Sequence, residues 1–415
     1  MSTFLSRQDP ELASLLNHEL KRQQFSIELI PSENIVSPAV LEALGSVLTN
    51  KYSEGYPGAR YYAGNAHIDE IERLAVSRAK ALFGVDHVNI QPYSGSGANF
   101  AVYNALLEPG DTILAMGLPF GGHLTHGWKV SATGKYFRAV HYPTGKDGRI
   151  DYEMVAELAL KEKPKLIVCG ASAYPRMIDF KHFREIADSV HAYLMADIAH
   201  IAGLVVGGVH PSPVPYADVI TTTLHKTLRG PRGAMIMCRE ELAAKIDKSI
   251  FPGLQGGPHN HVTAAAAVAF KEAATDEFRA YTQQVVTNAS ALAQTLIDSG
   301  FPLVSGGTDN HLMLLDLSEK SLTGKDAEDI LADCSISTNK NMIPNDPRTP
   351  MNPSGIRIGT PLITSRGFTA KDSVTLGVVI SSLLRTPESE EVRAWAKSEV
   401  RTLCEAHPIY GTLSY

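Results

Sequence analysis

Six short apolar segments, separated by helix-like stretches, lie between residues 87 and 238 and constrain the fold more than any other feature of the sequence. They are HVNIQP (87–92), DTILAM (111–116), KLIVCG (165–170), AYLMAD (192–197), DVITTT (218–223) and GAMIMC (233–238). Alternation of apolar strands with helices is typical of a mostly parallel sheet that is covered on both faces. The sequence therefore predicts an α/β fold built on a mostly parallel mixed sheet.

The flanking segments predict an arm and a second domain. Residues 10–25 have the pattern of a polar helix, and residues 68–83 that of an amphipathic helix ended by Gly84. A long helical stretch from about 261 to 299 leads into further strand candidates and a last helix that ends near His407. These strand candidates are HLMLLDL (311–317), ISTNK (336–340) and SGIRIGTP (354–361). We expect an N-terminal arm at 1–25, a large domain at 26–280 and a smaller α+β C-terminal domain at 281–415.

Charge and cysteine content exclude several classes of protein. The 415 residues carry a formal net charge of −6, so no overall positive field attracts nucleic acid. The four cysteines are widely spaced, which argues against a metal site and against disulfides. The N-terminal residues contain no apolar signal core, and no apolar stretch is long enough to span a membrane. We expect a cytoplasmic enzyme that binds no metal, nucleic acid or membrane.

Polar residues gather where the predicted strands end, which is where open α/β sheets bind their ligands. They are Ser94-Gly95-Ser96-Gly97, Ser172, Asp197, His200 and His225-Lys226. The first of these is a Gly/Ser loop that opens a helix, so its backbone N–H groups form a candidate phosphate site. A tight turn with a helix cap explains the same loop equally well.

Asp197 and Lys226 are the most informative pair. A carboxylate that ends an apolar strand needs a donor or a cation, and a structural ion pair with Lys226 would satisfy it. Pyridoxal phosphate requires the same two groups, an Asp at its ring nitrogen and a Lys that forms a Schiff base. With the Gly/Ser loop as phosphate cradle, the three features together indicate a pyridoxal-phosphate site.

Long motifs then carry a resemblance to a known family. They are LTNKYSEGYPGARYY, QPYSGSGANFAVYNALLEPGD, GGHLTHG, TTTLHKTLRGPRG, FPGLQGGPH, SGGTDNHLMLLDL and SGIRIGTP. The chain resembles serine hydroxymethyltransferase over nearly its whole length. The resemblance implies the aspartate aminotransferase-like fold of pyridoxal-phosphate enzymes, fold type I, with tetrahydrofolate as cosubstrate.

The resemblance also implies the role of each cofactor-binding residue. Lys226 matches the Schiff-base lysine, and Asp197 matches the carboxylate at the pyridine nitrogen. His123 matches the imidazole that stacks on the ring. The other matching cofactor contacts are Ser94, Gly95, Ser172, His200, His225, Tyr52 and Gly257. In the family, the Gly257 contact comes from the partner subunit.

Substrate and folate residues follow in the same way. Glu54 matches a proton shuttle to the substrate hydroxyl and folate, and Arg357 matches the residue that holds the substrate carboxylate. Tyr62 completes the catalytic set of Lys226, Glu54 and His123, and Ser32 and Arg232 are supporting positions. The matching folate positions are Leu118, Gly122, Leu124 and Asn341.

Other residues in these motifs have plainer interpretations. We expect His126 and His261 to be hydrogen-bonding scaffold groups and Tyr61 to pack in the core. Met342 and Met351 have the character of apolar fillers.

Some positions depart from the family pattern. Leu224, Ala234 and Ala63 replace residues that are common in the motifs, and so do Met342 and Met351-Asn352-Pro353 beside the expected folate pocket. The cofactor residues are unaffected, but the amino-acid substrate and the folate affinity are left open.

The resemblance implies conversion of L-serine and tetrahydrofolate to glycine and 5,10-methylenetetrahydrofolate. The same scaffold could instead act on 2-methylserine, or as a folate-independent threonine aldolase or transaldolase. A regulatory or RNA-binding homologue without the cofactor is the alternative from another class, and the retained site residues and acidic charge argue against it. Since Tyr52, Glu54 and Tyr62 match positions that complete the neighbouring subunit's site, we expect a homodimer with shared sites, alone or within a tetramer.

Overall fold

The computed structural model describes residues 4–415 and divides into two compact units. Unit 2 comprises Asn34–Gln283 and Ile343–Asn345. Unit 1 comprises the N-terminal residues through Glu33 together with Gln284–Met342 and Asp346–Tyr415. Each unit is described by itself.

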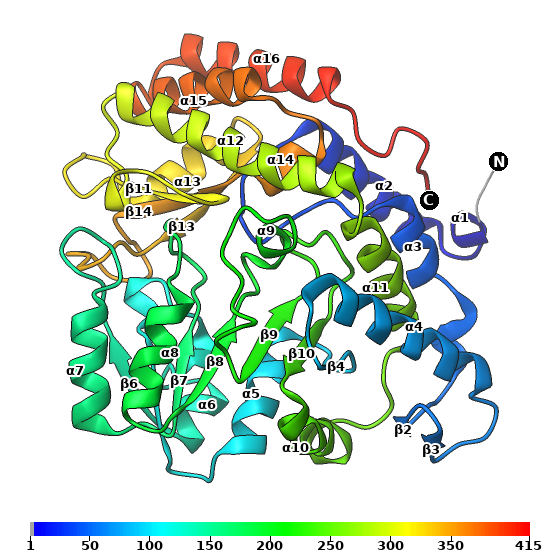
Figure 1. Cartoon of the computed structure of the whole chain (residues 1–415). Coiled ribbons are helices and arrows are strands. Elements are labelled where there is room, and N and C mark those ends of the chain that lie inside the picture. The colour runs from blue at the N-terminus through cyan, green and yellow to red at the C-terminus, as the bar shows by residue number, and fades with distance from the viewer. Residues whose placement is uncertain (1–3) are drawn as a thin grey trace. The chain divides into compact units, whose positions relative to one another are not determined.

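A seven-stranded sheet forms the centre of unit 2 (Figure 1). Its strands are β4 (His87–Asn89), β5 (Thr112–Met116), β6 (Arg138–Tyr142), β7 (Leu166–Cys169), β8 (Tyr193–Asp197), β9 (Val219–Thr223) and β10 (Ala234–Cys238). Their order is β4-β10-β9-β8-β7-β5-β6, and only β10 runs antiparallel to its neighbours. The predicted α/β fold with a mostly parallel mixed sheet is thus confirmed.

All six predicted strands are present, and β6 is an additional one. It lies at the edge of the sheet and begins with the exposed Arg138. Its sequence, RAVHY, is less apolar than the buried strands because an edge strand is only partly covered. The apolar-run criterion therefore missed it.

Helices cover both faces of this sheet because its central strands are buried along their whole length. Those of unit 2 are α3 (Pro38–Leu44), α4 (Ala66–Phe83), α5 (Gly95–Leu106), α6 (Ala132–Tyr136), α7 (Tyr152–Glu162), α8 (Phe180–Ser189), α9 (Ala202–Val206), α10 (Ala243–Lys248) and α11 (Asn260–Ala273). Helices α7 and α8 pack side by side near β6 and β7 (Figure 1). Two short strands, β2 (Gly55–Tyr56) and β3 (Ala59–Arg60), form a hairpin.

The helix predicted over 261–299 is in fact two helices, α11 and α12 (Asp276–Asp298). Thr275 separates them, because its Oγ1 accepts a hydrogen bond from the backbone N–H of Phe278 at 3.3 Å. This is the geometry of a helix N-cap, which begins α12. The sequence predicted a long helical stretch here but did not show the junction at Thr275.

Unit 1 has two small sheets. Strands β11 (Leu312–Asp316), β14 (Gly355–Gly359) and β13 (Asn339–Asn341) form an antiparallel sheet in that order, and β1 (Ile27–Glu28) pairs in parallel with β12 (Ile336–Ser337). The remaining helices are α1 (Phe4–Gln8), α2 (Pro10–Phe25), α13 (Gly324–Ala332), α14 (Pro361–Ser365), α15 (Ala370–Arg385) and α16 (Glu390–Ala406). One apolar cluster runs from Ile27 to Cys404 through these elements.

Arg366 ties the two ends of the chain together inside unit 1. Its buried guanidinium donates to the carbonyl oxygens of Gln23, Gln24 and Ser26, at the C-terminal end of α2. It also donates to those of Cys404 and His407, at the C-terminal end of α16. Carbonyls at helix ends lack partners within the helix, and a cation there also offsets the helix dipole.

A second contact joins the chain ends directly. The Nδ2 of Asn17 in α2 donates to the carbonyl oxygen of Tyr415 at 2.9 Å, and the backbone N–H of Tyr415 donates back to Oδ1 of Asn17 at 3.2 Å. The predicted N-terminal helix is therefore attached to the C-terminal residues of unit 1.

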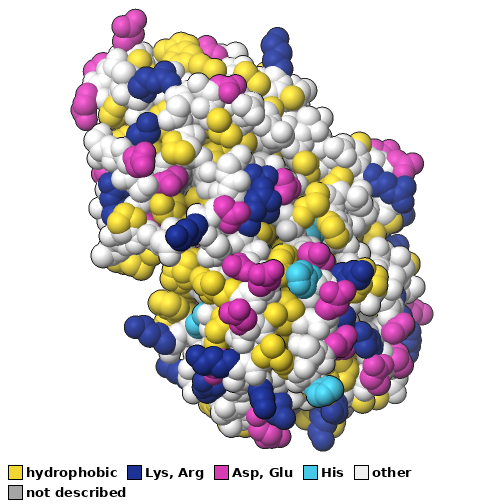
Figure 2. Space-filling model, turned by 60° about the vertical axis from the view of Figure 1, so that its left-hand side comes forward, with side chains coloured by type: hydrophobic (Ala, Val, Ile, Leu, Met, Phe, Trp, Pro, Cys, Tyr) yellow, Lys and Arg dark blue, Asp and Glu magenta, His cyan; other side chains and the backbone are white. Residues whose placement is uncertain are grey.

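The surface carries charges of both signs. On the face in Figure 2, Lys and Arg side chains are interspersed with Asp and Glu side chains. Among residues 4–415, no helix is long and apolar enough to cross a membrane.

Replacement of Arg366 by Met should lower the free energy of unfolding by about 3 kcal/mol or more, since each buried carbonyl left unpaired costs about 1–3 kcal/mol. Urea denaturation of the variant measures this loss. Arg385→Met is the control, because Arg385 is exposed and donates to a single carbonyl, that of Ser299; its effect should stay within about 0.5 kcal/mol. Equal effects of the two variants would contradict the tethering role of Arg366.

Candidate active site

The sheet of unit 2 brings the predicted cofactor residues to one edge. Strands β4, β5, β7, β8 and β9 all point the same way, because β4 and β9 are both antiparallel to β10. At their carboxyl ends come Ser94, His123, Ser172, His200 and Lys226, one from each strand. Residues far apart in the sequence therefore meet at the edge where α/β folds bind ligands.

Asp197 ends β8 and is surrounded by neutral donors. Its Oδ2 accepts hydrogen bonds from Nδ2 of Asn99 at 2.9 Å and Nε2 of His126 at 3.0 Å. Its Oδ1 accepts one from the backbone N–H of Ala199 at 3.1 Å. Burial alone would raise the pKa of Asp197, but the hydrogen bond from His126, the electrostatic attraction of the His126 and His123 rings and the hydrogen bond from Asn99 hold it well below its usual value. The carboxylate is therefore ionised at neutral pH.

The tautomer of His126 follows from its other nitrogen. Its Nδ1 accepts the backbone N–H of His123 at 3.2 Å, so the proton lies on Nε2 and is donated to Asp197. His126 is then a neutral donor and leaves the charge of Asp197 uncompensated. Among residues 4–415, neither a lysine nor an arginine pairs with this carboxylate, so the site has room for a cationic partner from elsewhere.

His123 is held by the same network. Its Nδ1 lies 2.7 Å from Oγ1 of Thr125 and accepts the backbone N–H of Thr125 at 3.2 Å. Thr125 Oγ1 in turn accepts from Nδ2 of Asn99 at 2.8 Å, and Oγ1 of Thr221 donates to Oδ1 of Asn99 at 2.7 Å. One amide therefore sets the position of both the carboxylate and the imidazole.

Lys226 follows β9 on a firmly held segment, and its side chain is buried. The carbonyl oxygen of Lys226 accepts a hydrogen bond from Nδ2 of Asn34 at 2.9 Å. Thr227 Oγ1 donates to the carbonyl of His200 at 3.0 Å, which joins this loop to the loop after β8. The backbone of the predicted cofactor lysine is thus fixed relative to β8.

The neighbouring basic residues have separate partners. The guanidinium of Arg229 lies 4.3 Å from the centre of the Tyr281 ring, a cation–π contact. Burial, together with the charges of Arg232 and Lys226, lowers the pKa of His225 to about 3. His225 is therefore neutral, and its buried Nδ1 has no hydrogen-bond partner within residues 4–415.

The Gly/Ser loop opens α5 as expected. Ser94 caps the helix, with its Oγ accepting the backbone N–H of Gly97 at 3.2 Å. A Cβ on Gly95 would lie 2.7 Å from Cγ2 of Thr223, so only glycine fits where α5 meets β9. Helix cap and phosphate cradle are compatible, because the cap uses the serine side chain and leaves the first backbone N–H groups of α5 available.

Four predicted residues form a second, exposed group in unit 2. Tyr52 and Tyr62 are 54% and 48% exposed, with ring centres 5.0 Å apart. Tyr52 OH donates to Oε1 of Glu54 at 3.3 Å, and a Cβ on Gly257 would meet the Tyr52 ring at 3.2 Å. The four residues predicted to serve a neighbouring subunit therefore lie together on one patch.

The substrate residues of unit 1 also lie close together. Arg357 is in β14, and its Nε donates to Oδ1 of Asn339 on β13 at 3.1 Å. Burial lowers the pKa of Arg357 to about 10, which keeps it a cation at neutral pH. Ser32 follows Pro31, against which Gly359 of β14 packs without room for a Cβ. The predicted folate residue Asn341 lies on β13, with its Nδ2 donating to the carbonyl oxygen of Met342 at 2.7 Å.

The predicted folate positions of unit 2 lie between β5 and α6. Leu118 and Leu124 are in short 3-10 turns, and Leu124 is half exposed. A Cβ on Gly122 would lie 2.0 Å from the carbonyl oxygen of Met116. The backbone alone thus requires glycine at this position.

Two of the plainer interpretations were wrong. Tyr61 is 74% exposed and does not pack in the core of this chain, and Met351 is 81% exposed and fills no interior space. Both lie in polar loops, where an apolar residue type does not imply burial. Within residues 4–415, no group of three or more His, Cys, Asp and Glu side chains could hold a metal ion.

Sequence reasoning missed Asn99 and Thr125, which position Asp197 and His123. His126 was expected to be a scaffold group, and its hydrogen bond to Asp197 confirms that interpretation. Asn99 lies one helical turn after Gly95 in α5, so its place on the face toward the strand ends was the available signal.

Comparison with known proteins decides the family. A family model described as serine hydroxymethyltransferase matches residues 5–380. The chain belongs to the serine hydroxymethyltransferase family. The serine hydroxymethyltransferase of Desulfotalea psychrophila (strain LSv54 / DSM 12343) is 60% identical over 409 residues, which are 99% of this chain and 96% of that protein. The predicted family and its fold type I architecture are confirmed.

Members of the serine hydroxymethyltransferase family use pyridoxal phosphate, and the residues present fit that group. The uncompensated anion of Asp197 suits a protonated pyridine nitrogen. The unpartnered Nδ1 of His225 and the close approach of Gly95 to β9 suit a ligand at the start of α5.

Replacement of Asn99 by Leu should lower the free energy of unfolding by about 2–4 kcal/mol at pH 7, since three hydrogen bonds of buried polar groups are lost. It should also raise the pKa of Asp197. The stability that comes from the depressed pKa is complete above the unfolded value of about 3.9 and is lost as the pH falls through the native value. Because the unfolded state is the same for both proteins, the difference between variant and wild type should shrink as the pH falls through the raised native pKa of Asp197 in the variant.

Urea unfolding at pH 7 and at successively lower pH, down to the lowest at which both proteins are still folded, measures this. Thr222→Val is the control. Thr222 is buried in β9 beside Thr221, the partner of Asn99, but its own Oγ1 donates to the carbonyl of Thr223 and not to the Asp197 network. A deficit for Asn99→Leu that stays constant over this pH range would show that Asp197 is not involved.

Proposed function

We propose that the protein interconverts L-serine and glycine, with tetrahydrofolate as the acceptor of the one-carbon unit. The observation that carries the proposal is the buried Asp197 carboxylate, which neutral donors hold in its ionised form beside the Lys226 segment of a serine hydroxymethyltransferase family chain.

When bound, pyridoxal phosphate supplies a protonated ring that accepts the electrons of a bond broken at the amino-acid α-carbon. Asp197 keeps the proton on the ring nitrogen, because the hydrogen bonds from Asn99 and His126 fix its charge. Lys226 would supply the amine that attaches the cofactor. His123, whose imidazole is oriented by Thr125, would contact its ring.

The remaining residues act on the amino acid. Arg357 holds its carboxylate with two parallel hydrogen bonds, for which a planar guanidinium is suited. Glu54 carries a proton between the substrate hydroxyl and folate. Tyr52 contacts both Glu54, by a hydrogen bond, and the ring of Tyr62. Ser32 supports the carboxylate from the segment packed on β14. We assign contacts with folate to Leu118, Gly122 and Leu124 of unit 2 and to Asn341 of unit 1, each by its match to the family.

The active form in this proposal is a homodimer with shared sites. Tyr52, Glu54, Tyr62 and Gly257 form one patch whose tyrosines are half exposed, and exposed aromatic groups of this kind favour an interface. In a two-fold dimer, the patch of each subunit serves the site of the other.

We place the protein in the cytoplasm. All four cysteines are buried and unpaired, which suits a reducing compartment.

The purified protein should convert serine to glycine only when tetrahydrofolate is present, and should prefer serine to 2-methylserine. Borohydride reduction and peptide mapping should place a pyridoxyl group on Lys226. Lys226→Ala should lose at least about a thousandfold in turnover while remaining folded. Lys271→Ala, a change at the surface of α11, is the control and should keep wild-type activity.

The alternatives have distinct outcomes in the same assay. A preference for 2-methylserine would identify that substrate, and aldol cleavage of threonine at full rate without folate would identify an aldolase. Either result would overturn the proposed reaction.

Mixing Lys226→Ala subunits with Glu54→Gln subunits should restore about a quarter of the wild-type activity. Random exchange makes half of the dimers hybrids, and each hybrid has one complete site out of two. The control pairs Lys226→Ala with a double variant that carries both changes, and should recover nothing. No recovery in the first mixture, after subunit exchange has been verified by mass spectrometry, would exclude shared sites.

A further inference from the structure

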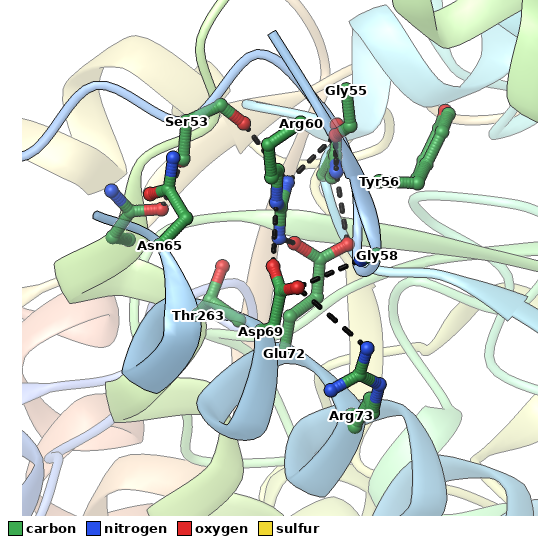
Figure 3. Close-up of polar contacts among 12 residues, drawn as sticks. Ser53, Gly55, Tyr56, Gly58, Arg60, Asn65, Asp69, Glu72, Arg73 and Thr263 are labelled. Carbon is green, nitrogen blue, oxygen red and sulfur yellow. Dashed lines mark hydrogen bonds and ion pairs between the residues drawn. The ribbon is translucent and has the colours of Figure 1, made fainter. Parts of the chain in front are cut away.

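The side chain of one buried arginine contacts the backbone on both sides of Glu54. Arg60 in β3 has a side chain only 4% exposed, and three of its nitrogens make four hydrogen bonds (Figure 3). Its Nη1 donates to the carbonyl oxygen of Ser53 at 2.9 Å and to that of Gly55 at 2.7 Å. These two residues flank Glu54, so one nitrogen holds the backbone on both sides of the proposed proton carrier.

The other face of the guanidinium is anchored to helix α4. Nε of Arg60 lies 2.9 Å from Oδ1 of Asp69, and Nη2 lies 2.6 Å from Oε2 of Glu72, whose side chains project from α4 (Figure 3). Both carboxylates have further neutral donors. The backbone N–H of Gly58 donates to Oδ2 of Asp69, and Nε2 of Gln91 donates to Oε1 of Glu72.

These contacts restrict how the loop can move. A shift of Glu54 away from α4 would separate the buried Arg60 side chain from two carbonyls or from the carboxylates of Asp69 and the buried Glu72, and a buried charge without its partner is costly. A second anchor limits the other end of the loop, because Oγ of Ser53 donates to Oδ1 of Asn260, and Nδ2 of Asn260 donates to the carbonyl of Lys51.

The side chain of Glu54 has a different environment. Its Oε1 accepts a hydrogen bond from the hydroxyl of the exposed Tyr52 at 3.3 Å. The Glu54 carboxylate thus belongs to the surface patch with Tyr52, whereas the backbone on both sides of Glu54 is held by the Arg60 side chain.

We propose that Arg60 is the positioning residue of Glu54, and that its two carbonyl contacts set the distance over which Glu54 transfers its proton. The inference rests on the proposed function, in which Glu54 carries that proton. An arginine is required because the fork must reach two carbonyls and two carboxylates at once, whereas a lysine ammonium has three N–H groups on a single nitrogen.

The test compares Arg60→Lys, which keeps the charge but not the fork, with wild type. A displacement of about 1 Å at a catalytic group costs on the order of a hundredfold in rate, so kcat for serine should fall about 10- to 100-fold with KM for serine within about threefold. Exchange of the glycine α-proton without folate needs no substrate hydroxyl and should stay within about threefold of wild type. Equal losses in both reactions would reduce Arg60 to a structural role and overturn the inference.

A double variant separates positioning from general damage. In a Glu54→Gln background, Arg60→Lys should cause little further loss of serine turnover, because the group that it positions is already gone. A further loss by the same factor as in the wild-type background would overturn the inference. Hydrogen exchange of residues 51–62 gives a readout independent of activity and should be faster in Arg60→Lys.

Arg73→Lys is the matched control. Arg73 is 58% exposed, lies 3.6 Å from the same Asp69 and belongs to the same helix as Glu72, but contacts neither flanking carbonyl. It should match wild type in every measurement. Should Arg60→Lys not fold, Asp69→Asn weakens the same anchor from the α4 side, and its serine turnover should fall about 3- to 10-fold while glycine exchange is kept.

Failure of the inference is distinguishable from failure of the proposed function. Wild type without folate-dependent serine turnover would reject the function. If wild type is active but Arg60→Lys has the wild-type kcat for serine and the wild-type backbone hydrogen exchange of residues 51–62, only the role of Arg60 is rejected.

Discussion

The ionised state of one buried carboxylate governs the chemistry that this protein can perform. Asp197 loses hydration when β8 is buried, and desolvation alone would favour its protonated form. Asn99, His126 and the backbone of Ala199 replace that hydration with fixed donors. Since all three donors are neutral, the negative charge is kept for a ligand. The hydrogen bonds of Asn99, Thr125 and Thr221 serve this one requirement.

Two ways of positioning catalytic groups coexist in unit 2. The residues at the strand ends are placed by the register of a parallel sheet and need only short loops. Glu54 lies instead in a hairpin region far from the sheet edge in sequence, and its backbone depends on buried charges contributed by Arg60 and α4. A rigid sheet positions the residues proposed to bind the cofactor, whereas an ionic network positions the loop residue proposed to act on the substrate.

The sequence was most informative where residues near each other in the chain decide the structure. Six apolar runs predicted six strands, and polar residues directly after them predicted the site edge. Asn99 and Thr125 escaped notice because their partners come from other segments, and the distance between segments is not visible in a sequence. The edge strand β6 and the Thr275 cap between α11 and α12 were missed because partial burial and a single hydroxyl leave weak patterns. The prediction that Tyr61 packs in the core was wrong, because residue type predicts burial only on average.

The tether formed by Arg366 bears on how the chain folds as it is synthesised. The last carbonyls of α2 receive their buried donor only when residue 366 has emerged, and the other half of the tether comes from residues 404 and 407. The hydrogen bond between Asn17 and Tyr415 can form only after residue 415 has been synthesised. Unit 2, in contrast, is nearly contiguous from Asn34 to Gln283. During synthesis, therefore, residues 34–283 can already be folded while α2 still lacks its contacts with the C-terminal residues.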